Sequence, residues 1–260
     1  MRHLVIALLI LCFTGCQTSQ KAPEVGSELG LLDEETREIW ELAHDGDSEA
    51  QNRLAIRYLD GTGGLSESIQ RAYEWFKRSA EGGNPWAMSN LARMYRDEDT
   101  IGVDLEQAET WFLKSAEAGN YQAMANLGEH FASGNGGVID FQKASFWYSR
   151  AVLGPFDPWI ANNAAWFFST VEDESLMKPE LSVNLMLRVI STREIYYEFD
   201  TLAAAYAAQG DFDSAIIAQQ RALEMGYDNE VDAAEMEDFE SRLSTYFDRQ
   251  RFIFYKSFSE

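Results

Sequence analysis

The sequence Ala50-Gln-Asn-Arg-Leu54-Ala-Ile-Arg-Tyr58 recurs in altered form as Ala87-Met-Ser-Asn-Leu91-Ala-Arg-Met-Tyr95 and as Ala123-Met-Ala-Asn-Leu127-Gly-Glu-His-Phe131. In each copy an alanine, a leucine and an aromatic residue stand four positions apart, which places them on one face of an α-helix. A second series recurs at the same period of about 36 residues: Ala72, Ala108 and Ala144, then Trp75, Trp111 and Trp147. Repetition at this period predicts a solenoid of stacked units, with the three tryptophans in its core.

Residues suited to capping helices recur at the same period. One series precedes the first helix of each unit and another precedes the second: Asp47, Asn84, Asn120 and Asp157, then Ser68, Asp104 and Asp140. Their side chains can accept hydrogen bonds from the first N–H groups of a helix. Pro85 and Pro158 follow two of them, at the position where proline fits a helix best. Each unit is therefore predicted to be a helix, a loop and a second helix.

These repeats resemble the Sel-one-like repeat (SLR), a branch of the tetratricopeptide (TPR) superfamily. The resemblance covers three units within residues 33–154, and residues 155–229 resemble ordinary TPR units. It implies an all-α fold, a right-handed α-solenoid of stacked helix-turn-helix repeats. Residues 230–260 are expected to form a capping helix and a tail. The buried stripe of that helix is predicted to carry Phe239, Leu243 and Phe247.

The first residues carry the pattern of an export signal. A basic residue precedes an apolar run of about ten residues, which is too short to span a bilayer and suits a signal peptide. The sequence Phe13-Thr14-Gly15-Cys16 resembles a bacterial lipobox, which implies a lipid on Cys16. We expect a signal peptide over residues 1–15, a flexible tether over 16–32 and a body anchored in the bacterial cell envelope. Gln17 implies, by the same resemblance, the periplasmic face of the outer membrane.

The composition excludes several classes of protein. The chain has 21 Lys and Arg against 43 Asp and Glu, so its net charge of −22 lacks the basic excess that nucleic-acid binding needs. An apolar fraction of 46% excludes a disordered acidic chain. The two cysteines, Cys12 and Cys16, both lie near the start, which leaves none for a disulfide framework or a cysteine-based zinc site downstream.

Two short motifs resemble a catalytic motif and a metal-binding loop, but each lacks other residues that such a site needs. Ser175 and Lys178 have the Ser-x-x-Lys spacing of penicillin-recognising enzymes, without the companion motifs. Residues 228–232 alternate acids as a calcium loop does, but lack the glycine and the closing glutamate. We therefore expect no catalytic residue, no metal and no cofactor.

A peptide-binding groove is the candidate functional site. In the superfamily that the repeats resemble, the first helix of each unit lines a concave groove, which the residue before the repeated leucine faces. That column is Arg53, Asn90, Asn126, Asn163 and Thr201, and the next one includes Arg93, Glu129 and Trp166. An asparagine amide can donate to and accept from a peptide backbone without reading its sequence. The alternative is that these residues cap neighbouring helices or face water.

The sequence favours binding over catalysis, because a solenoid offers much surface and no enclosed active site. We predict a non-enzymatic, lipid-anchored periplasmic interaction module or scaffold that binds an extended protein or peptide client and no nucleic acid. One alternative is an accessory factor for cell-wall enzymes or for assembly of an envelope machine such as a secretin or pilus. Another is a glycan-binding protein or hydrolase, which convergent carboxylates in the groove would support.

Overall fold

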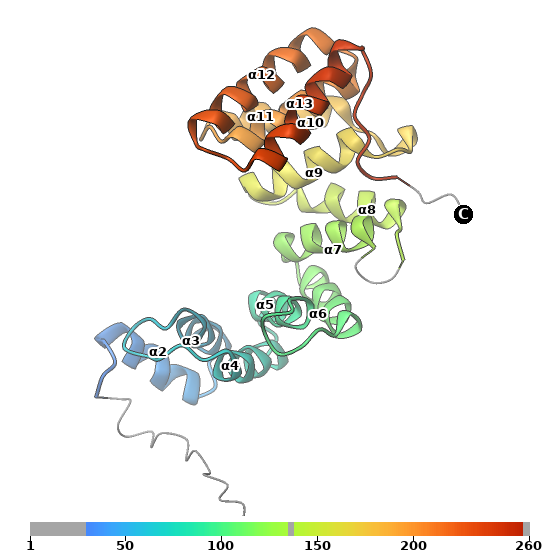
Figure 1. The fold of residues 1–260 in the computed structure, drawn as a ribbon. Helices are drawn as coiled ribbons and strands as arrows, with labels where there is room; N and C mark the ends of the chain where they lie inside the picture. The colour runs from blue at the N-terminus through green and yellow to red at the C-terminus, as the bar shows by residue number, and fades with distance from the viewer. Residues whose placement is uncertain (1–29, 135–137, 257–260) are drawn as a thin grey trace, which may run out of the picture.

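The computed structural model describes residues 30–134 and 138–256, and every regular element longer than one turn in them is an α-helix. Figure 1 shows an elongated stack that runs from α2 at one end to α13 at the other, which confirms the α-solenoid. The helices are α2 (Glu34–His44), α3 (Ser48–Asp60), α4 (Ile69–Glu81), α5 (Pro85–Arg96), α6 (Leu105–Glu117), α7 (Tyr121–Ser133), α8 (Phe141–Ala151), α9 (Pro158–Thr170), α10 (Pro179–Ile190), α11 (Tyr196–Gln209), α12 (Phe212–Asp228) and α13 (Ala233–Phe247), with a 3₁₀ turn, η1, at Glu174–Leu176.

The repeated apolar residues form the core, which continues from unit to unit. Leu54, Leu91 and Leu127 are completely buried, and one hydrophobic cluster extends across residue 154 without a break. The deepest rings of the second helices differ from the prediction. They are Phe76, Phe112 and Tyr148, each one residue after a repeated tryptophan.

The repeated tryptophans lie at different depths. Trp75 is buried, but Trp111 and Trp147 are half-buried beneath the cations of Lys114 and Arg150. A bulky indole reaches the rim of the interface between units, where a basic side chain covers its outer face.

All seven predicted cap residues accept hydrogen bonds at the start of a helix. Two of them also join neighbouring units. Asn84 donates its amide N–H to Glu49 at 2.8 Å, and Asn120 donates to the carbonyl oxygen of Pro85 at 3.2 Å. An aspartate could accept as a cap but could not donate this second bond, so asparagine at these positions links helix initiation to stacking.

The C-terminal helix α13 covers the end of the stack as predicted, but with a different stripe. Phe239 is buried, whereas Phe247 is 59% exposed and its neighbour Tyr246 is buried instead. Arg242 of α13 donates to Asp200 of α11 at 2.7 Å. Burial raises the pKa of this aspartate, and the arginine opposes that shift.

Part of the N-terminal prediction lies outside the described residues, including the signal peptide and Cys16. The end of the expected tether does not behave as a tether. Leu32 is buried in the first hydrophobic cluster, and the N–H of Asp33 donates to the carbonyl oxygen of Gly63 at 3.2 Å. At Gly64, which has a φ of +86°, a Cβ would lie 2.0 Å from the carbonyl oxygen of Leu31. The segment therefore packs onto a loop that only glycine permits.

Candidate functional site

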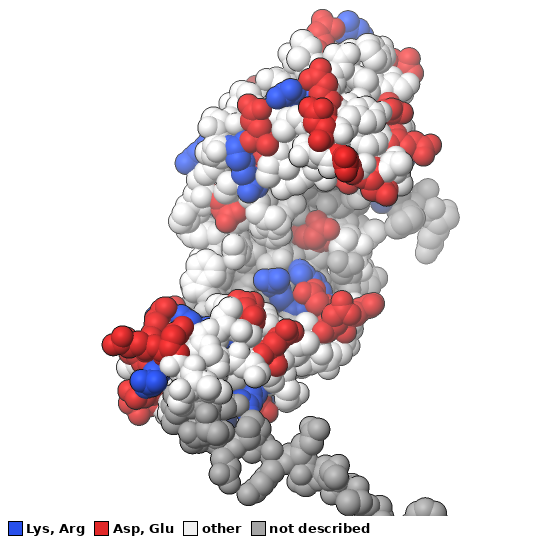
Figure 2. Space-filling view, turned by 60° about the vertical axis from the view of Figure 1, so that its left-hand side comes forward, with Lys and Arg blue, Asp and Glu red and all other residues white. Residues whose placement is uncertain are grey.

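A polar trough lies between the first helices of three successive units, α5, α7 and α9. Its volume is about 370 Å³. It is lined by Trp86, Ser89, Asn90, Arg93, Arg96, Gln122, Asn126, Glu129 and Trp159. Four of the eight residues predicted for the groove are therefore brought together: Asn90, Arg93, Asn126 and Glu129. Figure 2 shows a group of basic side chains at the waist of the molecule, between two acid-rich ends.

The repeat geometry explains this convergence. Asn90 and Arg93 stand one turn apart on α5, and Asn126 and Glu129 occupy the equivalent positions on α7. Residues three apart share a helix face, and stacking places equivalent faces side by side.

The asparagines are partly used by the fold. Asn90 donates to the side-chain oxygen of Asn52 at 3.2 Å, and Arg96 donates to that of Asn126 at 3.2 Å. Among the described residues, the side-chain oxygen of Asn90 and the side-chain NH₂ of Asn126 keep no partner. Each asparagine therefore uses one side-chain group to join neighbouring units, and one acceptor and one donor remain for a ligand.

Arg93 is the cation that the fold leaves unused in the trough. Its neighbour Arg96 donates to Asp97 at 2.8 Å, whereas the guanidinium of Arg93 is exposed and has no hydrogen-bond or ion-pair partner in residues 30–134 or 138–256. A chain with a net charge of −22 has many carboxylates that could pair with it. An arginine that stays unpaired in such a chain is available to an acidic group or a carbonyl oxygen of a ligand.

Glu129 joins the trough to the far end of the chain. Its Oε2 accepts the hydroxyls of Tyr148 and of Tyr255, each at 3.0 Å. Burial, followed by the nearby Glu129 carboxylate, raises the pKa of Tyr255 above its ordinary range. Burial also raises the pKa of Tyr148, aided by Tyr255 and Glu129. Both tyrosines therefore stay protonated and donate to the carboxylate at neutral pH.

Two tryptophans flank the trough and were not predicted as site residues. Trp86 is 52% exposed and Trp159 is 45% exposed, and each is the second residue of its helix. Gln122 holds the same position in α7, between them. The signal was present in the sequence as a proline and a tryptophan after a cap residue, at residues 84–86 and again at 157–159.

An apolar cavity of about 290 Å³ adjoins the trough at Trp86 and Gln122. Tyr121, Phe156 and Ile160 supply apolar walls. A ligand in the trough can therefore place an apolar side chain next to its polar contacts.

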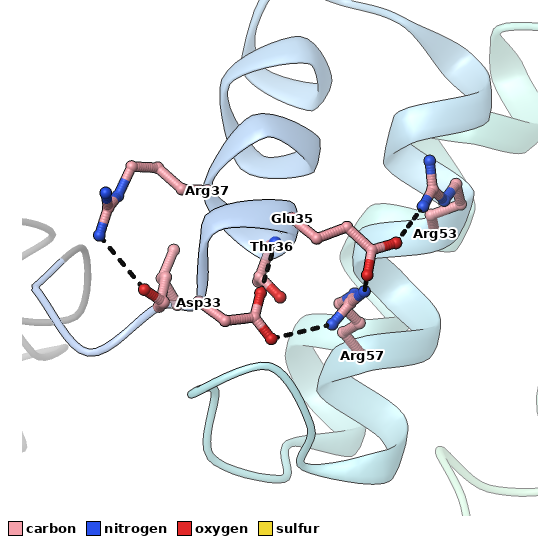
Figure 3. Close-up of polar contacts among 7 residues, drawn as sticks. Asp33, Glu35, Thr36, Arg37, Arg53 and Arg57 are labelled. Carbon is pink, nitrogen blue, oxygen red and sulfur yellow. Dashed lines mark hydrogen bonds and ion pairs between the residues drawn. The ribbon is translucent and has the colours of Figure 1, made fainter.

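Four predicted groove residues do not line the trough. In Figure 3, Arg53 of α3 points toward Glu35 of α2, and they form an ion pair at 2.6 Å. Thr201 is 3% exposed and donates its hydroxyl to the carbonyl oxygen of Tyr197, so the prediction that it faces the groove is wrong.

Asn163 is half-buried on α9 outside the trough. Trp166 is covered by the tail of the chain, because its ring lies 6.0 Å from that of Phe252 and 5.7 Å from that of Phe254. These contacts arise from a helix and a tail that belong to distant parts of the sequence, which the repeat pattern does not describe.

The two motifs that suggested chemistry are structural in the described part of the chain. Ser175 donates to Asp173, and Lys178 donates to Ser149, so the serine and lysine are engaged separately. Asp232 caps α13. No group of three metal-ligating side chains occurs within residues 30–134 and 138–256. No helix in these residues is long and apolar enough to cross a bilayer.

The chain is similar to known repeat proteins in sequence and in fold. The Sel1 repeat family model matches residues 48–84, 87–120 and 122–154. A Sel1 repeat protein from Oxalobacter formigenes has 20% identity and a TM-score of 0.57, over 82% of this chain and 98% of that one. A putative Sel1 repeat protein from Klebsiella pneumoniae has 18% identity and a TM-score of 0.50, over 79% of this chain and 99% of that one. No curated protein matches the sequence.

Proposed function

We propose that this chain binds an extended segment of a client protein in the polar trough. Its residues 48–154 are Sel1 repeats, which typically form protein–protein interaction modules. The observation that carries the proposal is the unpaired guanidinium of Arg93 in a trough that two exposed tryptophans also line. Tryptophan and arginine are the residues that most often dominate binding energy at protein interfaces.

The trough suits an extended segment better than a small rigid ligand. Asn126 and Asn90 leave one donor and one acceptor for a peptide backbone, and Arg93 can pair with an acidic side chain or a carbonyl group. The adjoining cavity beside Trp86 can take an apolar side chain of the same segment. Specificity then comes from the order of these groups along the client.

We place this module in the bacterial envelope as a lipid-anchored protein. The support is the sequence Phe13-Thr14-Gly15-Cys16 and the residue Gln17 that follows it, which favours the periplasmic face of the outer membrane. Acylation of Cys16 is tested by labelling cells with a tagged fatty acid, with Cys16→Ser as the control. Label that persists in the variant, or processing unaffected by globomycin, contradicts the anchor.

The binding site is tested by crosslinking capture from the envelope with matched pairs of variants. Trp86→Ala and Arg93→Ala should each strongly reduce capture of the client. Phe146→Ala removes a ring that is also 52% exposed, from α8, and Lys77→Ala removes an exposed cation from α4. These two controls should leave capture unchanged. Equal capture by the trough variants and the controls would contradict the proposal.

The alternatives differ in what is captured. Cell-wall enzymes or components of a secretin or pilus would identify an accessory factor, which binds through the same trough. A sugar polymer would favour the glycan-binding alternative. For a hydrolase, a second carboxylate beside Glu129 would be needed, and Glu129 is the one carboxylate among the lining residues.

A further inference from the structure

The end of the chain returns to a helix that lies about 80 residues earlier. After α13, residues 251–256 are extended and run beside α9 toward α8 (Figure 1). The N–H groups of Phe254 and Tyr255 donate to the carbonyl oxygen of Thr170 at 3.0 and 3.3 Å, and Glu172 donates back to Tyr255 at 2.9 Å. Arg251 donates to the carbonyl oxygens of Val171 and Glu172. The three bonds between main-chain groups are of the kind that hold a bound peptide.

The side chains of this segment cover Trp166, the residue of α9 that was predicted to line the groove. Phe252 and Phe254 contact the ring of Trp166, and Tyr255 packs at 5.3 Å from Phe167. The Tyr255 hydroxyl then reaches Glu129, which also lines the polar trough. The segment is therefore seated directly beside the proposed client site and shares one carboxylate with it.

Most side chains of the segment are only partly buried. Tyr255 is buried, but Phe254 is 56% exposed and Phe252 is half-buried. The chain enters the segment through Arg249, whose φ of +51° lies in the left-handed region that favours glycine. A short, partly exposed segment with a strained entry belongs to the part of a protein that opens most easily.

We infer that the face of α9 around Trp166 is a second peptide-binding site, and that residues 251–256 fill it as an intramolecular ligand until a client displaces them. This inference rests on the proposed function, because the client runs from the trough onto α9 past Glu129. The partner segment that fits is extended, with aromatic side chains for Trp166 and a hydroxyl or N–H donor for Glu129.

The test uses the complete mature chain and a labelled synthetic peptide with the sequence of residues 249–256. The wild-type chain should bind the peptide weakly because its own tail fills the site. A variant with Phe252, Phe254 and Tyr255 all changed to Ala should bind it about tenfold or more tightly, and adding Trp166→Ala should remove that gain. Phe247→Ala removes a 59% exposed ring from α13 and should leave the weak binding unchanged. Equal affinity of the wild-type chain and the tail variant overturns the inference.

Hydrogen exchange in the unaltered chain gives a second measurement that does not depend on folding of a variant. The amides of Phe254 and Glu172 should exchange faster than those in the middle of α9. Exchange as slow as in α9 identifies the tail as a permanent part of the fold and refutes displacement. Failure here is distinguishable from failure of the proposed function, because Arg93→Ala would still reduce client capture.

Discussion

Replacing Gly128 by alanine tests the packing that brings Tyr148 to Glu129. Gly128 lies within α7, and a Cβ there would be 2.8 Å from three atoms of the Tyr148 ring. Alanine favours a helix over glycine by about 0.5–1 kcal/mol. Overpacking of a filled core costs about 1–3 kcal/mol. The ring cannot retreat, because it is completely buried against Phe167 and its hydroxyl is bonded to Glu129.

The clash therefore outweighs the helix preference, and we expect Gly128→Ala to lower the free energy of unfolding by about 1–2 kcal/mol. Urea denaturation followed by circular dichroism measures this change. In a Tyr148→Leu background the facing ring is gone, and the same substitution should become neutral or stabilising, which a double-mutant cycle reads as coupling. If Gly128→Ala stabilises the wild-type chain, or if the cycle shows no coupling, the packing argument is wrong.

Three further changes test separate features of the structure. Asn120→Asp keeps the helix cap but loses the bond to Pro85, so urea denaturation should show a loss of about 1–2 kcal/mol, although the two residues cap equally well. Arg242→Leu leaves the carboxylate of Asp200 buried without its cation, so the free energy of unfolding should fall by about 3 kcal/mol at neutral pH. The loss should shrink as the pH is lowered and Asp200 is protonated, and a loss independent of pH would contradict this. Because burial beside a carboxylate raises the pKa of Tyr255, its docking should not change up to about pH 9 and should weaken above about pH 10, where the released hydroxyl ionises. A difference titration of tyrosinate absorbance against Tyr255→Phe measures that ionisation, and an ionisation at the ordinary pKa would refute the docked state.

The repeat pattern was enough to predict the stack and the start of each helix from α3 to α9. Caps such as Asp104 act within three residues of their own position, and stripes such as Ala50, Leu54 and Tyr58 lie on a single helix. These are local properties, and a period near 36 residues carries them from one unit to the next. For the same reason the sequence brought Asn90 and Asn126 to one trough, since equivalent residues of stacked units lie side by side.

The pattern was less informative where a residue's neighbour comes from outside the repeat. Trp166 belongs to the predicted groove column, but the tail covers it. Arg53 belongs to the other predicted column, which holds the asparagines, but α2 supplies Glu35 as its partner. Trp86 stands in a sequence motif of a cap residue, a proline and a tryptophan, but its exposure depends on the neighbouring helices α7 and α9.

The sequence by itself determined an all-α stack of repeats and the order of its helices, because these depend on local capping and on periodic burial of apolar faces. Only the tertiary structure decided which of the groove residues remain available to a ligand. Arg93 is left without a partner, whereas Arg53, Thr201 and Trp166 are bonded, buried or covered. The physical reason is that availability depends on every neighbour in space, including a tail that meets Glu129 from 126 residues further along the chain.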